Sequence, residues 1–142
     1  MIIMAIDIGE VRTGLAVCDS GESFAFPRGV IHERNRAKLV EKIVLAMREN
    51  NAELIVAGLP KNMDGSEGFK AQECREVAEQ VAAASGLPLE MQDERLTTVS
   101  AHIALESSEI SGKKRKNVVD TVAATIILEN FLTKRKQQSK GD

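Results

Sequence analysis

The chain has 142 residues, of which 43% are hydrophobic, 28% charged and 3% aromatic, a balance typical of one globular domain. The longest apolar run, residues 1–6, is far shorter than the roughly 20 residues that span a membrane, and it lacks the basic start of a signal peptide. We therefore expect a single cytoplasmic domain over residues 1–142 that does not contact a membrane.

The cysteine count excludes one kind of site, and the aromatic count argues against another. Cys18 and Cys74 are too few for a zinc site built on thiolates. Four phenylalanines, with no tryptophan or tyrosine, argue against a stacking platform for single-stranded nucleic acid. Charge is distributed unevenly: the net charge is −2, but eight basic and only two acidic residues lie between positions 113 and 140. The sequence thus predicts an acidic body with a basic C-terminal tail from about residue 134.

Hydrophobic patterns predict three strands in the first part of the chain. The run at 2–8, apolar except for Asp7, is typical of a strand covered on both faces. Residues 9–14 are expected to form a turn, and residues 15–18 a second strand paired antiparallel to the first. A third strand is expected over 24–31, where Pro27 favours an edge position.

Helices and strands then alternate along the chain. Apolar residues at helical spacing predict helices over 36–49 and 69–85, and apolar runs predict strands over 54–59 and 87–92. Thr97 or Thr98 could begin a helix that ends near residue 107. Residues 108–116 are expected to form a polar, basic loop before a last helix over 117–132. This order predicts an α/β fold with a mixed five-stranded sheet, helices on both faces and the first strand at its centre.

Carboxylates stand at the ends of predicted strands and at the start of the last helix. Asp7 closes the first, central strand, where open α/β sheets carry their sites. Asp93 and Glu94 follow the strand at 87–92, and alternation sends their side chains to opposite faces, so we expect only one to join Asp7. Asp120 shares a helical face with Ala124.

Each acid also has an ordinary structural interpretation. Asp7 could cap its strand, Arg95 could pair with Asp93 or Glu94, and Asp120 could complement the helix dipole. Together, however, three clustered carboxylates repel one another unless a cation neutralises them. Oxygen ligands of this kind suit Mg²⁺ or Mn²⁺, and two such ions would support phosphodiester hydrolysis. The predicted catalytic set is Asp7, Asp120 and an acid of the Asp93–Glu94 pair, with Asp7, Glu94 and Asp120 as the metal ligands.

Several sequence blocks resemble the bacterial YqgF/RuvX family. They run in the family's order over nearly the whole chain: Met4-Ala5-Ile6-Asp7-Ile8-Gly9, Arg12-Thr13-Gly14-Leu15-Ala16-Val17, Gly58-Leu59-Pro60-Lys61-Asn62-Met63-Asp64-Gly65, Asp93-Glu94-Arg95-Leu96-Thr97-Thr98 and Val119-Asp120-Thr121-Val122-Ala123-Ala124. The resemblance implies an RNase H-like fold and an active site formed by Asp7, Asp120 and an acid of the Asp93–Glu94 pair. Family members are described as Holliday junction resolvases and as nucleases for pre-16S ribosomal RNA. Glu10 and Val11 depart from the small or hydroxyl residue and the basic residue expected there.

Basic residues near these acids are candidates for nucleic-acid contacts. Lys61 and Asn62 follow the strand at 54–59 and could reach a phosphate, or they could form an ordered turn that caps the next helix. Contacts of this type position nucleic acid without reading its sequence. The predicted nucleic-acid-binding residues are Arg12, Lys61, Asn62, Arg95, Lys113, Lys114, Arg115 and Lys116.

Three functions remain open at this point. The first is a metal-dependent nuclease that processes the 5′ end of pre-16S ribosomal RNA. The second is a resolvase of four-way DNA, which must cut two strands symmetrically and would therefore act as a homodimer. The third is a non-catalytic module that binds structured nucleic acid. An ATPase of the actin-like or sugar-kinase-like class needs a second domain, for which 142 residues leave no room.

Overall fold

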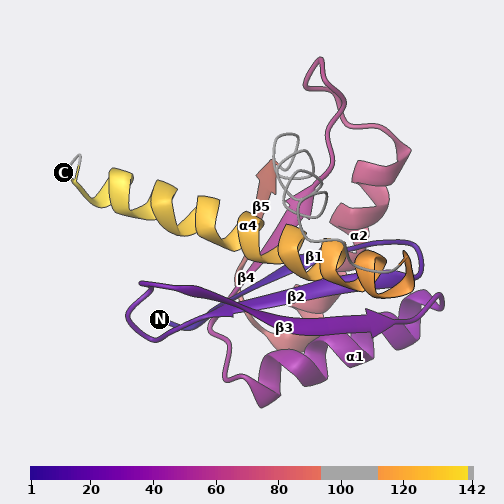
Figure 1. Ribbon diagram of the computed structural model, residues 1–142, viewed down its shortest axis with the longest axis horizontal. Coiled ribbons are helices and arrows are strands. Elements are labelled where there is room, and N and C mark those ends of the chain that lie inside the picture. Colours follow the sequence, from indigo (N-terminus) through magenta and orange to yellow (C-terminus); the bar gives the residue numbers. More distant parts are fainter. Residues whose placement is uncertain (94–111, 141–142) are drawn as a thin grey trace.

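The computed structural model describes the backbone of residues 1–93 and 112–140 and the side chains of residues 1–93 and 121–138. Five strands form one sheet, and three described helices pack on it (Figure 1). The strands are β1 (Ile3–Asp7), β2 (Arg12–Cys18), β3 (Ala25–His32), β4 (Leu54–Leu59) and β5 (Leu89–Asp93). The helices are α1 (Arg36–Glu49), α2 (Phe69–Ser85) and α4 (Gly112–Lys140).

The strand order is β3-β2-β1-β4-β5, so the predicted mixed sheet with β1 at its centre is confirmed. β1 pairs antiparallel with β2 and parallel with β4, and β4 pairs parallel with β5. β3 is an edge strand, as Pro27 indicated. The turn predicted over 9–14 is shorter in the structure, because Arg12 pairs with His32 and Gly14 with Asp7. β2 therefore begins at Arg12 and not at residue 15.

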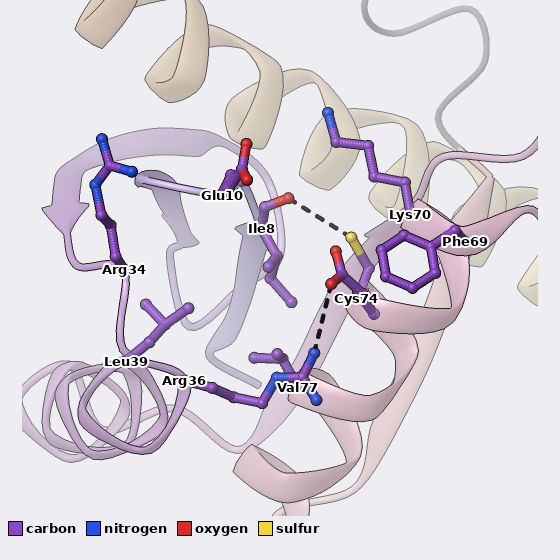
Figure 2. A pocket seen from close by; sticks show the side chains of 11 residues that line it. Ile8, Glu10, Arg34, Arg36, Leu39, Phe69, Lys70, Cys74 and Val77 are labelled. Atoms are coloured by element: carbon purple, nitrogen blue, oxygen red, sulfur yellow. Dashed lines mark hydrogen bonds and ion pairs between the residues drawn. The ribbon is translucent and has the colours of Figure 1, made fainter.

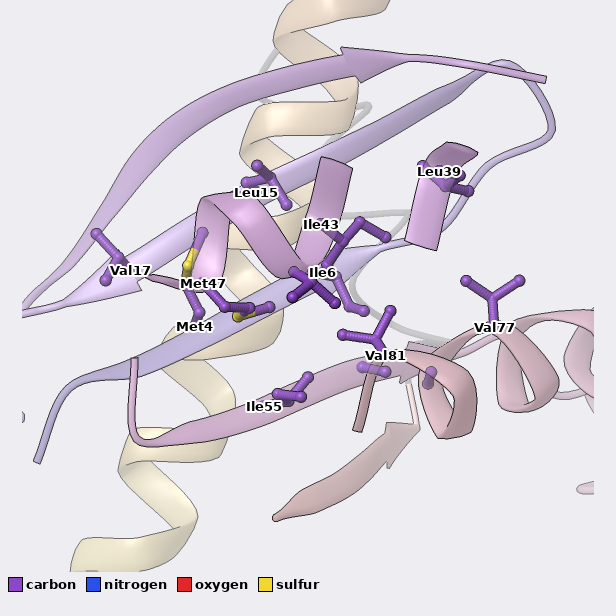
Figure 3. Packing of buried hydrophobic residues seen from close by; sticks show 13 residues of the cluster. Met4, Ile6, Leu15, Val17, Leu39, Ile43, Met47, Ile55, Val77 and Val81 are labelled. Carbon is purple, nitrogen blue, oxygen red and sulfur yellow. The ribbon is translucent and has the colours of Figure 1, made fainter. Parts of the chain in front are cut away.

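Alternation along the strands divides the core into two layers. Met4 and Ile6 of β1 lie in the layer between the sheet and helices α1 and α2 (Figure 3). Ile3 and Ala5 lie in the opposite layer, which α4 covers with Ala124, Ile127, Leu128, Phe131 and Leu132. Both layers are buried, which explains why β1 is apolar at every position before its final aspartate.

Local signals fix the ends of α1 and α2. Asn35 caps α1, since its side-chain oxygen accepts a hydrogen bond of 3.0 Å from the Lys38 amide. α2 ends at Gly86, whose φ of 75° is a left-handed conformation that glycine adopts without strain. Both helices occupy the ranges predicted from sequence.

α4 is longer than its sequence pattern indicates. Residues 112–116, predicted as part of a loop, belong to the helix, and residues from 134 onward continue it to Lys140. The charged run suggests a loop, but lysine and arginine are good helix formers, and the chain has no proline or glycine between 113 and 140. The helix predicted from Thr97 or Thr98 lies outside the described residues. Within the described part of the chain, no helix is long and apolar enough to cross a membrane.

Candidate active site

Asp7 is the last residue of β1 and is partly buried. Ile3 and Ala5 face α4, and alternation therefore gives Asp7 the same face. The turn that follows is tight, because a Cβ atom on Gly9 would overlap the carbonyl oxygen of Arg12. Glycine at position 9 thus allows the chain to reverse directly after Asp7, which holds this carboxylate at the edge of the sheet.

The direction of α4 determines which of its ends lies near Asp7. Arg135, close to the helix C-terminus, donates hydrogen bonds of 2.7 and 3.2 Å to the carboxylate of Glu22. Glu22 also pairs at 3.1 Å with the amino group of Met1, beside the start of β1. The C-terminal part of α4 therefore lies where β1 begins, and its first turns lie at the edge where β1 ends (Figure 1).

Asp120 occupies this N-terminal part of α4. It stands one turn before Ala124 and two turns before Ile127, both of which are buried against the sheet. Position 120 is thus on the stripe of α4 that faces the sheet, toward the edge that carries Asp7. The side chain of Asp120 is outside the described part of the structure.

Asp93 ends β5 on the other face of the sheet. Leu89 and Met91 pack against the layer that contains α1 and α2, and alternation places Asp93 with them. Asp93 is exposed and pairs with Leu59, and β4 separates its strand from β1. The structure therefore separates Asp93 from Asp7 by face as well as by strand. Glu94 and Arg95 lie outside the described residues.

The loop after β4 contains the two polar residues proposed for phosphate contact. The side-chain amide of Asn62 donates a 3.0 Å hydrogen bond to the hydroxyl of Ser66, and its backbone amide bonds the Ser66 carbonyl at 2.8 Å. Asn62 thus orders the loop, as the structural alternative held, although α2 has no side-chain cap at Gly68. Lys61 is partly buried at the same edge of the sheet.

The remaining basic candidates also map to this edge. Arg12 begins β2 directly after the turn that follows Asp7, and it is partly buried. Lys113 to Lys116 belong to the first turns of α4, by backbone position, and not to a loop. No group of three potential metal ligands occurs among the side chains that the structure describes, which do not include those of Glu94 and Asp120. Of the three predicted acids, the structure therefore describes the position of Asp7 and, by its backbone alone, that of Asp120.

Comparison with solved structures identifies the fold. The structure of Thermus thermophilus RuvC in complex with a Holliday junction substrate matches with a TM-score of 0.58 at 12% identity, covering 95% of this chain and 96% of that one. The fowlpox virus resolvase in complex with Holliday junction DNA matches with a TM-score of 0.58 at 11% identity, covering 94% and 98%. The chain therefore has the α/β, RNase H-like fold of these resolvases.

Sequence comparison identifies the family. The model of the RuvX family, described as Holliday junction resolvase, matches residues 1–134. A protein of an Anaeromyxobacter species named "Putative pre-16S rRNA nuclease" is 38% identical over 135 residues, which cover 95% of this chain and 98% of the relative. A Leuconostoc mesenteroides protein of the same name is 39% identical over 145 residues, covering 99% and 100%. This chain belongs to the RuvX family.

Proposed function

We propose that this protein is a metal-dependent nuclease that hydrolyses phosphodiester bonds at the 5′ end of pre-16S ribosomal RNA in the cytoplasm. The observation that carries the proposal is the position of Asp7, at the end of the central strand and on the face covered by α4. The first turns of α4, with Asp120, come to the same edge of the sheet. Relatives of nearly equal length are named for this activity.

The donor set at this edge suits a hard divalent cation. Asp7 and Asp120 offer carboxylate oxygens, and Mg²⁺ and Mn²⁺ prefer such oxygens together with water and substrate phosphate. We propose Glu94 as the third ligand, in line with the sequence prediction, because Asp93, the other acid of the pair, follows Leu89 and Met91 on the face opposite to Asp7. Two bound ions would polarise a phosphodiester and lower the pKa of a water molecule. The chain itself would hold the strand through Arg12, Lys61 and the first turns of α4.

The named relatives support ribosomal RNA over branched DNA as the proposed substrate. The relatives named as pre-16S rRNA nucleases share more than a third of their residues with this chain over nearly its full length. The two structures bound to junction DNA are 12% and 11% identical to this chain, and identity at this level supports a similar fold alone. Cutting a single RNA end requires no dimer, whereas junction resolution calls for a two-fold pair of sites. We therefore propose RNA processing, with junction resolution as the competing activity.

A cleavage assay with three variants tests both the activity and the site. We expect wild-type protein with Mg²⁺ or Mn²⁺ to shorten a 5′-extended 16S precursor and to leave a four-way DNA junction uncut. Asp7→Asn and Glu94→Gln should each lower the rate by at least about 100-fold, since even indirect support of a metal site is worth 10- to 100-fold. Asp93→Asn is the matched control, because it removes a neighbouring carboxylate on the other face, and it should keep the rate within about threefold.

Three other results would contradict this proposal. Cleavage of the junction alone would assign the resolvase activity. No cleavage of either substrate, together with salt-sensitive RNA binding that Asp7→Asn leaves unchanged, would assign a non-catalytic binding module. Loss of activity in Asp93→Asn with retention in Glu94→Gln would reverse the choice between these two acids.

A further inference from the structure

A pocket opens at the same edge of the sheet as Asp7, on the face opposite to α4. It has a volume of about 410 Å³ and lies between the segment that follows β1, the start of α1 and the first turns of α2 (Figure 2). Ile8, Gly9 and Glu10 line it, and these three residues come directly after Asp7. A strand of nucleic acid bound at Asp7 would therefore reach this pocket by crossing the edge of the sheet.

The floor of the pocket is apolar. Leu39 and Val77 are each about 4% exposed and meet there with Ile8. Cys74 of α2 lies beside them, and its thiol donates a 3.6 Å hydrogen bond to the carbonyl of Ile8, which ties the end of β1 to the helix (Figure 2). An apolar floor of this kind suits a flat ring better than a small ion, and the volume lies in the range of small-molecule sites.

Phe69 stands at the mouth of this pocket. It begins α2 and is 77% exposed, the greatest exposure of any phenylalanine in the part of the chain that the structure describes. Its ring lines the pocket beside Cys74 (Figure 2). An exposed aromatic ring over an apolar hollow can stack on a nucleobase, and such stacking tolerates any base because each presents a π-face.

Cations flank the opening. Arg34 and Lys70 lie on opposite sides of the pocket, one before α1 and the other in the first turn of α2 (Figure 2). Arg36 has a different role, since it bonds Glu76 at 2.9 Å and lies 3.7 Å from Glu73, which holds α1 against α2. The N-terminus of α2 adds positive potential. A phosphate group at this mouth would thus meet a cation on each side, with Glu10 as an exposed acid in the lining that opposes them.

We propose that this pocket binds one nucleotide of the nucleic-acid strand that passes Asp7, with its base against Phe69 and the apolar floor and its phosphate between Arg34 and Lys70. The inference rests on the proposed function for the identity of the strand. The chemistry it requires, a ring joined to a phosphate, is also that of a free nucleotide. One ring at one pocket is a single contact and differs from the extended aromatic platform that the composition argues against.

Equilibrium binding tests the pocket without cleavage. In the Asp7→Asn background, fluorescence anisotropy with labelled precursor RNA should show that Phe69→Ala weakens binding by about 5- to 100-fold, the range expected for removal of one base stack. Lys70→Ala should weaken it less and should flatten its salt dependence. Phe24→Ala removes a ring that is 67% exposed and does not line this pocket, and Arg48→Ala removes a cation from the far end of α1. Both controls should bind as the parent does.

Competition with adenosine monophosphate separates the two sources of a nucleotide. We expect millimolar adenosine monophosphate to leave RNA binding unchanged, because the strand is held at several points. RNA affinity that is the same in Phe69→Ala and Phe24→Ala would overturn the proposal. Binding of adenosine monophosphate that Phe69→Ala abolishes, with unchanged RNA affinity, would overturn it in favour of a free-nucleotide site.

The binding experiment and the cleavage assay can succeed or fail independently of each other. If wild-type protein cuts the precursor and Phe69→Ala binds RNA normally, the proposed function stands and the pocket assignment fails. If wild-type protein cuts nothing and Phe69→Ala loses affinity, the pocket assignment stands and the nuclease proposal fails. Thermal melting of each variant checks folding, and Lys70→Glu, at an exposed position, provides a second variant whose loss of affinity should exceed that of Lys70→Ala.

Discussion

At the scale of single residues, Thr13 is the polar side chain that the core leaves unsatisfied. It is fully buried, and its hydroxyl has no hydrogen-bond partner among the described residues. A buried hydroxyl without a partner lowers stability by about 1–3 kcal/mol. Leu15 and Val17 on the same strand face the apolar layer under α1 and α2, and alternation gives Thr13 this environment.

Thr13→Val should therefore stabilise the protein. Valine has the same shape and removes the unsatisfied hydroxyl, so the free energy of unfolding should rise by about 1–2 kcal/mol. Urea denaturation measures this difference directly. Thr133→Val, at an exposed position of α4, is the control and should change stability little. A destabilised Thr13→Val protein would mean that the hydroxyl has a partner after all.

Glu10 is the residue whose charge opposes the proposed nucleotide pocket. It lines the mouth and is exposed, and it replaces a small or hydroxyl residue expected from the family resemblance. Glu10→Gln removes one negative charge and should tighten RNA binding by about 2- to 5-fold at low salt, with the gain disappearing as salt screens the charge. Glu79→Gln, on the exposed side of α2, is the comparison variant. Equal affinities of the two variants would show that the strand passes Glu10 at a distance.

The candidate site was only partly accessible from sequence. Asp7 could be recognised because it ends an apolar strand, and Asp120 because it keeps the period of its helix. Glu94 stays a prediction as the third acid, because the structure describes only Asp93 of the pair, whose face follows from that of Leu89 and Met91 on β5. The pocket was missed for a different reason: Arg34 and Lys70 are 36 positions apart in the sequence, and tertiary packing alone brings them to one opening.

At the scale of elements, α4 is held by an ion pair at its C-terminal part. Arg135 donates to Glu22, and its guanidinium stands 5.7 Å from the ring centre of Phe131. The hydrogen bond from Arg135 is the main cause that lowers the pKa of Glu22 below its usual value, and the amino group of Met1 adds to it. The ionised form of Glu22 thus stabilises the folded chain by linking α4 to the loop between β2 and β3.

This link predicts how stability changes with pH. A lowered folded-state pKa means that the stabilisation is complete above the usual pKa of glutamate and is lost as the pH falls through the lowered value. We expect the melting temperature of wild-type protein to fall more between pH 5 and pH 3 than that of Glu22→Gln, which lacks the titrating group. Glu49→Gln, at the exposed end of α1, should follow the wild-type profile. Parallel profiles for Glu22→Gln and wild type would contradict the role of this pair.

The elements themselves were largely predictable, and α4 shows where the prediction was wrong. Caps and breakers such as Asn35 and Gly86 mark the ends of α1 and α2 in the sequence. The residues from 112 to 116 carry no apolar member, so hydrophobic periodicity could not assign them to a helix. The signal that favours the longer helix is the high helix propensity of lysine and arginine. No glycine or proline lies between residues 113 and 140 to end the helix.

At the scale of the whole molecule, the basic residues of α4 are divided between two opposite edges of the sheet. The first turns of α4, with Lys113 to Lys116, lie at the edge that carries Asp7, whereas Lys134 and Lys136 lie toward the opposite edge. The net charge of −2 would oppose binding to a polyanion. Basic residues placed at one edge can overcome this by meeting phosphates locally.

The salt dependence of RNA binding tests this arrangement. Replacing Lys113, Lys114, Arg115 and Lys116 by glutamine should reduce the slope of log affinity against log salt by roughly 0.7 for each phosphate that the protein no longer neutralises. The double replacement of Lys134 and Lys136 by glutamine removes cations from the other end of the same helix and should preserve the slope. Equal reductions in both proteins would place the nucleic acid along the whole of α4.

The topology of the sheet followed from general rules. Short connections make antiparallel neighbours of the first three strands, and right-handed crossovers place β4 and β5 on the other side of β1. These rules predict that Asp7 ends the central strand of the sheet, and the structure confirms that position. They do not determine on which face of the sheet the last side chain of each strand lies. That face decides which groups can lie near Asp7.

The division of the core into two layers also affects how the protein is made. The layer under α1 and α2 can close once residue 81 has left the ribosome, because its buried members all come from the first part of the chain. The other layer waits for Ala124 to Leu132, so that Ile3, Ala5 and Val56 keep an apolar face open during most of synthesis. A nascent chain of this protein therefore exposes one of its two core layers until α4 emerges, and it is in this interval that apolar surface prone to aggregation is open to solvent.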